Sequence, residues 1–199
     1  MTGAHESPPF SPLAVVLMLE MPLTLRRGRE QNTYLSRMAR EAARISARHL
    51  GIDDPTFPKT EDGVPLAERG FFWSVSHKPH AVAGIVHAHA VGIDIERIRP
   101  MADGMFDLIG YGAEWDMLAE IERFERFFRL WTAKEATLKA VSIGLKGLSR
   151  CRLESCSPDC LHLRVDHEMF SVYQERRMDH LVSVAIRATR PVFRWETIL

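Results

Sequence analysis

The 199-residue sequence lacks an excess of charge of either sign, because 26 basic residues balance 26 acidic ones. Proteins that bind nucleic acids usually show a surplus of basic residues, so we expect no nucleic-acid partner, and an anion must bind at a local site. Long apolar runs are also lacking. The longest near the N-terminus, residues 12–23, contains Glu20 and is too short to span a bilayer. Without a signal-peptide pattern, we expect a cytoplasmic protein that does not contact a membrane.

Cysteine and lysine are scarce. The three cysteines lie within ten residues of one another without C-x-x-C spacing, which favours reduced thiols over a zinc site. Five lysines stand against 21 arginines, and three of the five, Lys134, Lys139 and Lys146, lie within thirteen residues. Because a compact ammonium group commonly binds phosphate oxygens, this segment is a candidate phosphate site.

The apolar pattern divides the chain into two halves at a break near Pro100. We predict an α+β protein with a pseudo-duplicated fold, in which each half packs a small antiparallel sheet on a long helix and a cleft lies between the halves. The predicted subdomains are residues 1–100 and 101–199. Predicted helices cover residues 30–50, 113–122 and 124–141. Predicted strands cover residues 13–19, 71–76, 81–88, 91–96, 150–154, 161–164, 170–173 and 181–187, and those at 71–76, 81–88 and 91–96 are expected to form a three-strand meander.

Two acids lie two positions apart in the predicted strand at 91–96. Side chains alternate between the faces of a strand, so the apolar residues of this strand would face a core, while Asp94 and Glu96 would share the solvent-facing side with Cα atoms about 6.5 to 7 Å apart. Such a pair is more often a solvated sheet face than a metal site. A third nearby acid would favour a hard cation such as Mg²⁺, which prefers oxygen ligands.

The predicted helix at 124–141 offers that third acid. Trp131, Glu135 and Lys139 fall at positions i, i+4 and i+8, along one stripe of the helix. One interpretation is a surface ion pair between Glu135 and Lys139, stabilising by about 0.2 to 0.5 kcal/mol. The other makes Glu135 a metal ligand and Lys139 a contact for a pyrophosphate.

A second candidate phosphate site lies where the strand at 71–76 ends in a polar turn. Here Ser76, His77, Lys78 and exposed backbone N–H groups could together hold a phosphate. The alternative is that His77 is an ordinary turn residue, since the chain has nine histidines.

Three ordered motifs resemble the 4'-phosphopantetheinyl transferases. They are Ser-x-Ser-His at 74–77, Gly-Ile-Asp-Ile-Glu at 92–96 and Trp-x-x-Lys-Glu-Ala-x-x-Lys at 131–139. Their spacing is similar to that of the larger monomeric type, which includes the surfactin-synthetase-activating enzyme. The resemblance runs from about residue 63 to residue 148.

The resemblance implies the roles of most site residues. Mg²⁺ would be bound by Asp94, Glu96 and Glu135, and Glu135 would also be a candidate general base. The phosphates of coenzyme A would be met by Ser76, His77 and Lys139.

Three further residues follow from the resemblance. Glu114 stands where a second catalytic acid assists in some members. Gly63 precedes Val64, where the family often has a lysine near the nucleotide. The N-terminal arginines Arg26, Arg27, Arg37 and Arg40 are candidates to meet the 3'-phosphate of coenzyme A, and the alternative for each is a solvated helix or turn residue. Of the four, we take Arg37 as the contact.

The implied function is transfer of the 4'-phosphopantetheine arm of coenzyme A to a serine of an apo acyl or peptidyl carrier protein, with release of adenosine 3',5'-bisphosphate. We expect a monomer on which the carrier protein docks at residues 103–118. The apolar side chains of that segment, Met105, Phe106, Leu108 and Tyr111, either form the docking surface or pack into the core. One alternative is a catalytically degenerate protein that binds coenzyme A or a carrier protein. Another is an unrelated magnesium-dependent phosphohydrolase that attacks with water.

Overall fold

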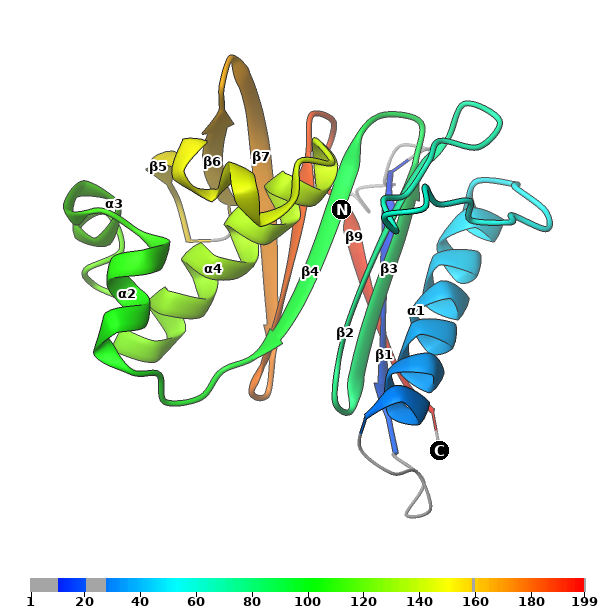
Figure 1. The fold of residues 1–199 in the computed structure, drawn as a ribbon, viewed down its shortest axis with the longest axis horizontal. Coiled ribbons are helices and arrows are strands. Elements are labelled where there is room, and N and C mark those ends of the chain that lie inside the picture. Colours follow the sequence, from blue (N-terminus) through cyan, green and yellow to red (C-terminus); the bar gives the residue numbers. More distant parts are fainter. Residues whose placement is uncertain (1–10, 21–27, 159, 199) are drawn as a thin grey trace, which may run out of the picture.

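Two β-sheets lie face to face between two long helices in the computed structural model, which describes residues 11–20, 28–158 and 160–198 (Figure 1). The first sheet has the strand order β2 (Phe72–Lys78), β3 (Ala81–His87), β1 (Leu13–Leu19) and β9 (Val192–Ile198). The second has the order β4 (Val91–Arg97), β8 (His180–Ile186), β7 (Glu168–Arg177), β6 (Cys160–Val165) and β5 (Cys151–Cys156). Neighbouring strands are antiparallel except β1 and β9, which are parallel.

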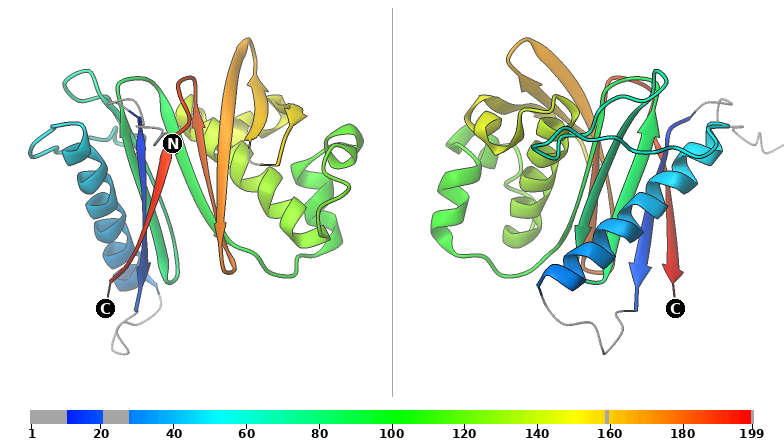
Figure 2. Two further views of the ribbon diagram at one scale, coloured as in Figure 1. Left: turned by 180° about the vertical axis from the view of Figure 1, so that it is seen from behind. Right: turned by 45° about the vertical axis from the view of Figure 1, so that its right-hand side comes forward.

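The layering explains why several strands are apolar along their whole length. One face of β1 packs on helix α1 (Arg29–His49), and the other packs on the second sheet through Ala14 and Val16. Strands buried on both faces read as continuous apolar runs, as Leu13–Leu19 does. Helix α4 (Arg123–Ala140) covers the outer face of the second sheet, so the order is helix, sheet, sheet, helix (Figure 2).

Each long helix approaches its sheet most closely at one glycine. A Cβ atom on Gly84 of β3 would lie 2.4 Å from the backbone nitrogen of Ala43 in α1. A Cβ atom on Gly92 of β4 would lie 1.9 Å from the carbonyl oxygen of Ala136 in α4. Only a residue without a side chain allows this approach, so Gly92 sets how closely α4 lies over the acid-bearing strand.

Three shorter helices lie in the second half of the described chain, two before α4 and one after it. They are α2 (Asp103–Ile109), α3 (Gly112–Asp116) and the 3₁₀ helix η1 (Gly144–Arg150). In the predicted docking segment, Met105 and Phe106 pack against the core of the second half, whereas Leu108 and Tyr111 are 66% and 50% exposed. The core interpretation therefore holds for Met105 and Phe106, and docking of a carrier protein on Leu108 and Tyr111 stays a prediction.

The α+β class and the two long helices are confirmed. The predicted meander is wrong, because β4 pairs with β8 instead of β3. Alternation of side chains shows which face of a strand is apolar, but it does not identify the neighbouring strand. The helix predicted at 113–122 is limited to α3 and a following turn, while α2 and β9 were not predicted.

Sheet membership crosses the predicted boundary at residue 100. Strand β4 precedes this boundary but belongs to the second sheet, and β9 follows it but belongs to the first. The subdomain ranges stay a prediction. Among the helices in the described ranges, none is long and apolar enough to cross a membrane.

Candidate active site

The edges of the two sheets meet at β2 and β4, and side chains from β2 bind the free edge of β4. The Ser74 hydroxyl accepts a hydrogen bond from the Ile93 backbone N–H at 3.1 Å, and Ser76 donates one to Asp94 Oδ1 at 2.7 Å. From α4, Lys139 Nζ donates to the Ile93 carbonyl at 3.0 Å. The two serines thus join the halves of the molecule directly beside the acid-bearing strand.

The two acids of β4 are buried, which corrects the expectation that they face solvent. Asp94 is 4% exposed and Glu96 is 5% exposed. They do lie opposite Ile93 and Ile95, as alternation requires, but α4 covers their face of the strand. The sequence shows that the face is polar and does not show what lies over it.

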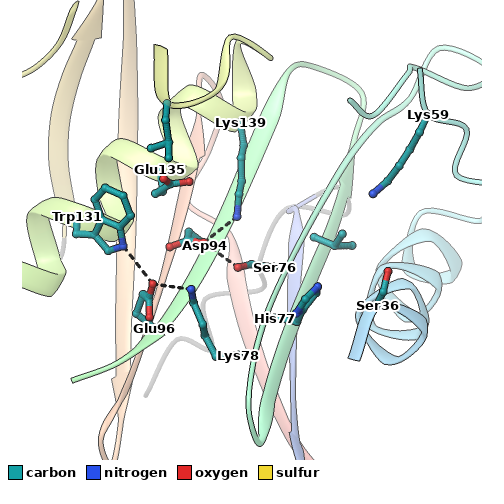
Figure 3. Close-up of a pocket in the computed structure, with 12 residues that line it drawn as sticks. Ser36, Lys59, Ser76, His77, Lys78, Asp94, Glu96, Trp131, Glu135 and Lys139 are labelled. Atoms are coloured by element: carbon teal, nitrogen blue, oxygen red, sulfur yellow. Dashed lines mark hydrogen bonds and ion pairs between the residues drawn. The ribbon is translucent and has the colours of Figure 1, made fainter. Parts of the chain in front are cut away.

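One cavity of about 430 Å³ contains most of the predicted site (Figure 3). Its walls include the three acids and four residues predicted to meet phosphate, namely Asp94, Glu96, Glu135, Ser76, His77, Lys78 and Lys139. They come from β2, β4 and α4, so residues far apart in the sequence converge here. The remaining lining residues are Ser36, Lys59, Val75, Trp131 and Leu145.

Lysines neutralise two of the three acids. Lys139 Nζ lies 2.7 Å from Asp94 Oδ1, and Lys78 Nζ lies 2.8 Å from Glu96 Oε1. The indole N–H of Trp131 also donates to Glu96 Oε1, at 3.1 Å. The surface ion pair considered between Glu135 and Lys139 is therefore replaced by a pair between Lys139 and Asp94.

The electrostatic setting shifts the pKa of two cavity residues. Burial raises the pKa of Glu135, and the neighbouring Asp94 carboxylate raises it further. Burial lowers the pKa of His77, and the positive charge of Lys139 lowers it further. Glu135 is thus a better proton acceptor than an ordinary carboxylate once ionised, and His77 is neutral near pH 7.

The donor atoms fit a hard divalent cation. The three carboxylates supply the oxygen ligands that Mg²⁺ prefers, and Asp94 Oδ2 is buried without a hydrogen-bond partner among the described residues. With two acids engaged by lysines, no three acidic, histidine or cysteine side chains in the described chain converge closely enough to hold a metal ion as they stand. A bound cation would therefore replace Lys78 and Lys139 as the counter-charge of Glu96 and Asp94.

The structure does not bring Glu114 to this cavity. Glu114 is 4% exposed and forms a buried ion pair with Lys134, whose Nζ lies 2.8 Å from Glu114 Oε1. Its carboxylate also accepts hydrogen bonds from the backbone N–H groups of Tyr111 and Leu153. Of the lysine cluster at 134–146, only Lys139 lines the cavity, since Lys134 is buried in this pair and Lys146 is exposed.

Gly63 and Arg37 line hollows that adjoin the cavity. The hollow with Gly63 has a volume of about 250 Å³ and shares Lys59 and Lys139 with the cavity. The hollow with Arg37 has a volume of about 870 Å³, shares His77 with the cavity and is also lined by Arg40. Arg26 and Arg27 lie outside the described residues.

Lys59 is the charged lining residue that the sequence interpretation missed. It lies in the connection between α1 and β2, outside the three motifs. A signal was available, because three of the five lysines of the sequence line this one cavity.

Comparison with known proteins agrees with this geometry. A sequence model described as the 4'-phosphopantetheinyl transferase superfamily matches residues 90–185, from β4 to β8. The chain is 32% identical over 150 residues to 4'-phosphopantetheinyl transferase psf-1 of Bacillus pumilus, covering 71% of this chain and 64% of the relative. The chain belongs to the 4'-phosphopantetheinyl transferase superfamily.

Two other transferases of the superfamily show the same level of similarity. The chain is 33% identical over 104 residues to 4'-phosphopantetheinyl transferase gsp of Aneurinibacillus migulanus, covering 51% of this chain and 44% of the relative. It is 30% identical over 122 residues to 4'-phosphopantetheinyl transferase HetI of a Nostoc strain, covering 55% and 52%. The matches span less than two thirds of the length of each of these relatives.

Proposed function

We propose that this protein transfers the 4'-phosphopantetheine arm of coenzyme A to a serine of an apo acyl or peptidyl carrier protein. The observation that carries the proposal is the single cavity at the seam of the two sheets, which combines three carboxylates with three lysines. Transfer of a phosphoryl-type group depends mainly on positioning and on neutralisation of charge. Both are available in this cavity.

We assign Asp94, Glu96 and Glu135 as the residues that would hold Mg²⁺. When bound, the ion would neutralise charge on the pyrophosphate of coenzyme A. Lys139 and Lys78, released from Asp94 and Glu96, would then have ammonium groups available for phosphate oxygens. Ser76 and His77, both from β2, also line the cavity and would donate hydrogen bonds to phosphate oxygens of coenzyme A.

Glu135 acts as the general base in this proposal. Its carboxylate takes the proton of the acceptor serine, whose oxygen forms a bond to the β-phosphorus of coenzyme A. The bond from that phosphorus to the bridging oxygen breaks, and the electron pair leaves with adenosine 3',5'-bisphosphate. The raised pKa of Glu135 belongs to the metal-free protein; with the ion bound, a carboxylate oxygen that does not contact the ion would accept the proton.

Glu114 is assigned a positioning role. Its buried pair with Lys134 ties the segment before α4 to the helix that carries Glu135. The exposed Leu108 and Tyr111 of that segment would contact a helix of the carrier protein. We propose further that the enzyme is a cytoplasmic monomer of the larger transferase type.

We also propose that the two halves arose by duplication. Each sheet packs against one long helix at a strand glycine, Gly84 against α1 and Gly92 against α4, and in each case alanines of the helix face the glycine. The shared packing supports a common origin, with β4 and β9 exchanged between the two sheets.

Intact-protein mass spectrometry of an apo carrier protein tests the function. After incubation with the enzyme, coenzyme A and Mg²⁺, the carrier should gain one phosphopantetheine arm, and EDTA should prevent the gain. Glu135→Gln should lose the activity, whereas Glu154→Gln, at an exposed site on β5, should keep it. Coenzyme A binding without any gain would favour the degenerate binding protein, and nucleotide release without a carrier would favour a hydrolase.

A further inference from the structure

Lys59 lines the cavity from the connection between α1 and β2, which contains none of the three motifs. It begins a tight backbone turn in which Thr60 N donates to the Val64 carbonyl and Gly63 N donates to the Thr60 carbonyl, both at 2.9 Å. Its Nζ lies 5.5 Å from the centre of the Trp73 ring. The turn and the ring contact thus place this ammonium group at the cavity.

Lys59 is the cavity lysine that lacks a carboxylate partner. Lys139 is paired with Asp94 and Lys78 with Glu96, but across the described ranges no acid lies within ion-pair distance of Lys59 Nζ. Burial lowers its pKa, and the positive charges of Arg40 and Lys139 lower it further. An ammonium group placed among other cations is unfavourable in the free protein, so its position suits an anionic ligand.

Lys59 lies on the side of the cavity opposite the three acids. Asp94, Glu96 and Glu135 lie on β4 and α4, and Lys59 lies across the cavity from them (Figure 3). In a phosphoryl-type transfer the attacking and leaving oxygens lie roughly in line on opposite sides of phosphorus. If Glu135 receives the proton of the attacking oxygen, the leaving oxygen faces the wall of Lys59.

We propose that Lys59 binds the phosphate that leaves with the nucleotide and neutralises the charge that develops on its bridging oxygen. This inference rests on the proposed function. As the bond between the β-phosphorus and the bridging oxygen breaks, that oxygen keeps the electron pair and accepts a hydrogen bond from Lys59 Nζ. Lys59 is thus a catalytic residue on the leaving-group side, opposite the base.

Binding of the two halves of coenzyme A tests this assignment. Calorimetry with Lys59→Met should show binding of adenosine 5'-monophosphate and of adenosine 3',5'-bisphosphate weakened about 10- to 100-fold, the range for a hydrogen bond to a charged group. Binding of 4'-phosphopantetheine should change less than about twofold. Lys59→Arg should restore part of the loss, and Lys146→Met, at an exposed lysine, should change none of the three.

Stability and turnover give two further readouts. Lys59→Met should melt at the same temperature as wild type or higher, because it removes repulsion from Arg40 and Lys139. Its kcat should fall about 10-fold or more, since charge on a leaving group grows only in the transition state.

Each other outcome overturns the assignment. Equal weakening for 4'-phosphopantetheine would make Lys59 a general source of positive charge, and weakening for the bisphosphate alone would place it at the 3'-phosphate. Unchanged binding of all three probes would exclude Lys59 from the site. These results differ from failure of the proposed function, in which wild-type protein transfers no phosphopantetheine.

Discussion

Asp94 shows how a single buried carboxylate depends on its neighbours. Oδ1 accepts hydrogen bonds from Ser76 and Lys139, while Oδ2 has no partner within the described part of the chain. Replacement by alanine would leave both donors without their acceptor, a cost that the sequence did not reveal because it suggested an exposed side chain. Replacement by asparagine keeps the shape and one acceptor oxygen, and it removes the charge.

Asp94→Asn should therefore separate activity from stability. We expect phosphopantetheine transfer to fall by at least about 100-fold, as is typical when a charged catalytic contact is lost, while the free energy of unfolding changes by only about 1 kcal/mol. The transfer rate by mass spectrometry and a thermal melt measure the two effects. Asp166→Asn, in an exposed turn, is the matched control; full activity in Asp94→Asn would refute the site.

His77 should make coenzyme A binding depend on pH. Burial and Lys139 hold its pKa below the usual value of about 6.5, so the free ring is neutral near pH 7. A dianionic phosphate beside the ring favours its protonated form and raises this pKa. Between the free and bound values, binding takes up a proton, and affinity rises as the pH falls from the bound pKa towards the free pKa, which lies below about 6.5.

Calorimetry in buffers with different ionisation enthalpies measures that proton uptake. His77→Asn should abolish it, whereas His167→Asn, in an exposed turn, should leave it unchanged. Uptake of equal size in His77→Asn would assign the proton to another group.

At the residue scale, the sequence predicts which residues carry the chemistry better than it predicts the environment of each side chain. Asp94, Glu96, Glu135 and Ser76 are recognisable because their spacing follows from strand and helix geometry. Lys59 is not recognisable in this way, since the connection between α1 and β2 that carries it has no periodic pattern of apolar residues.

The contact between β4 and α4 determines the geometry of the site at the scale of elements. Gly92 lies against the backbone of Ala136, and the next two outward-facing residues of the strand are Asp94 and Glu96. A small displacement of the helix would therefore move Glu135 relative to both acids. Backbone atoms cannot relax as a flexible side chain can, so the contact is intolerant of added volume.

Gly92→Ala should be strongly destabilising. We expect a loss of about 3 kcal/mol or more of unfolding free energy, the upper range for overpacking, and a melting temperature lower by about 6 to 12 °C. Gly112→Ala is the matched control, since no atom lies within 4 Å of its added Cβ; helix propensity makes it neutral or slightly stabilising. Equal melting temperatures for the two variants would contradict the close approach.

The elements were predicted to different extents for physical reasons. The long helices α1 and α4 have sustained periodicity, and both are recognisable from the sequence. Strand β9 is an edge strand with the charged residues Arg194 and Glu196, which protect an edge but interrupt the apolar pattern.

At the scale of the whole molecule, the two sheets exchange one strand each. Strand β4 from the first half pairs with β8, and β9 from the end of the second half pairs with β1 over seven residues. The sheets also share an apolar interface formed by residues such as Val16, Ile85, Ile93 and Val184. The halves are therefore joined by backbone pairing as well as by packing.

This exchange predicts that neither half folds alone. Residues 1–100 and 101–199 produced separately should each show no cooperative thermal transition by circular dichroism, because each would expose an unpaired strand and half of a core. Mixing the two fragments under refolding conditions should restore the transition. A cooperative melt of either fragment alone would show that its sheet is self-sufficient.

The pairing of early strands with late ones also affects how the protein is made. Synthesis proceeds from the N-terminus, so β1, α1 and β3 leave the ribosome long before their partners. The inner apolar face of the first sheet packs on both β4 and β8, so it is only partly covered until β8 emerges, and β1 lacks one neighbour until β9 emerges. Folding of this protein must therefore be completed after most of the chain has been translated, and a chaperone that shields Ala14 and Val16 in the meantime would favour it.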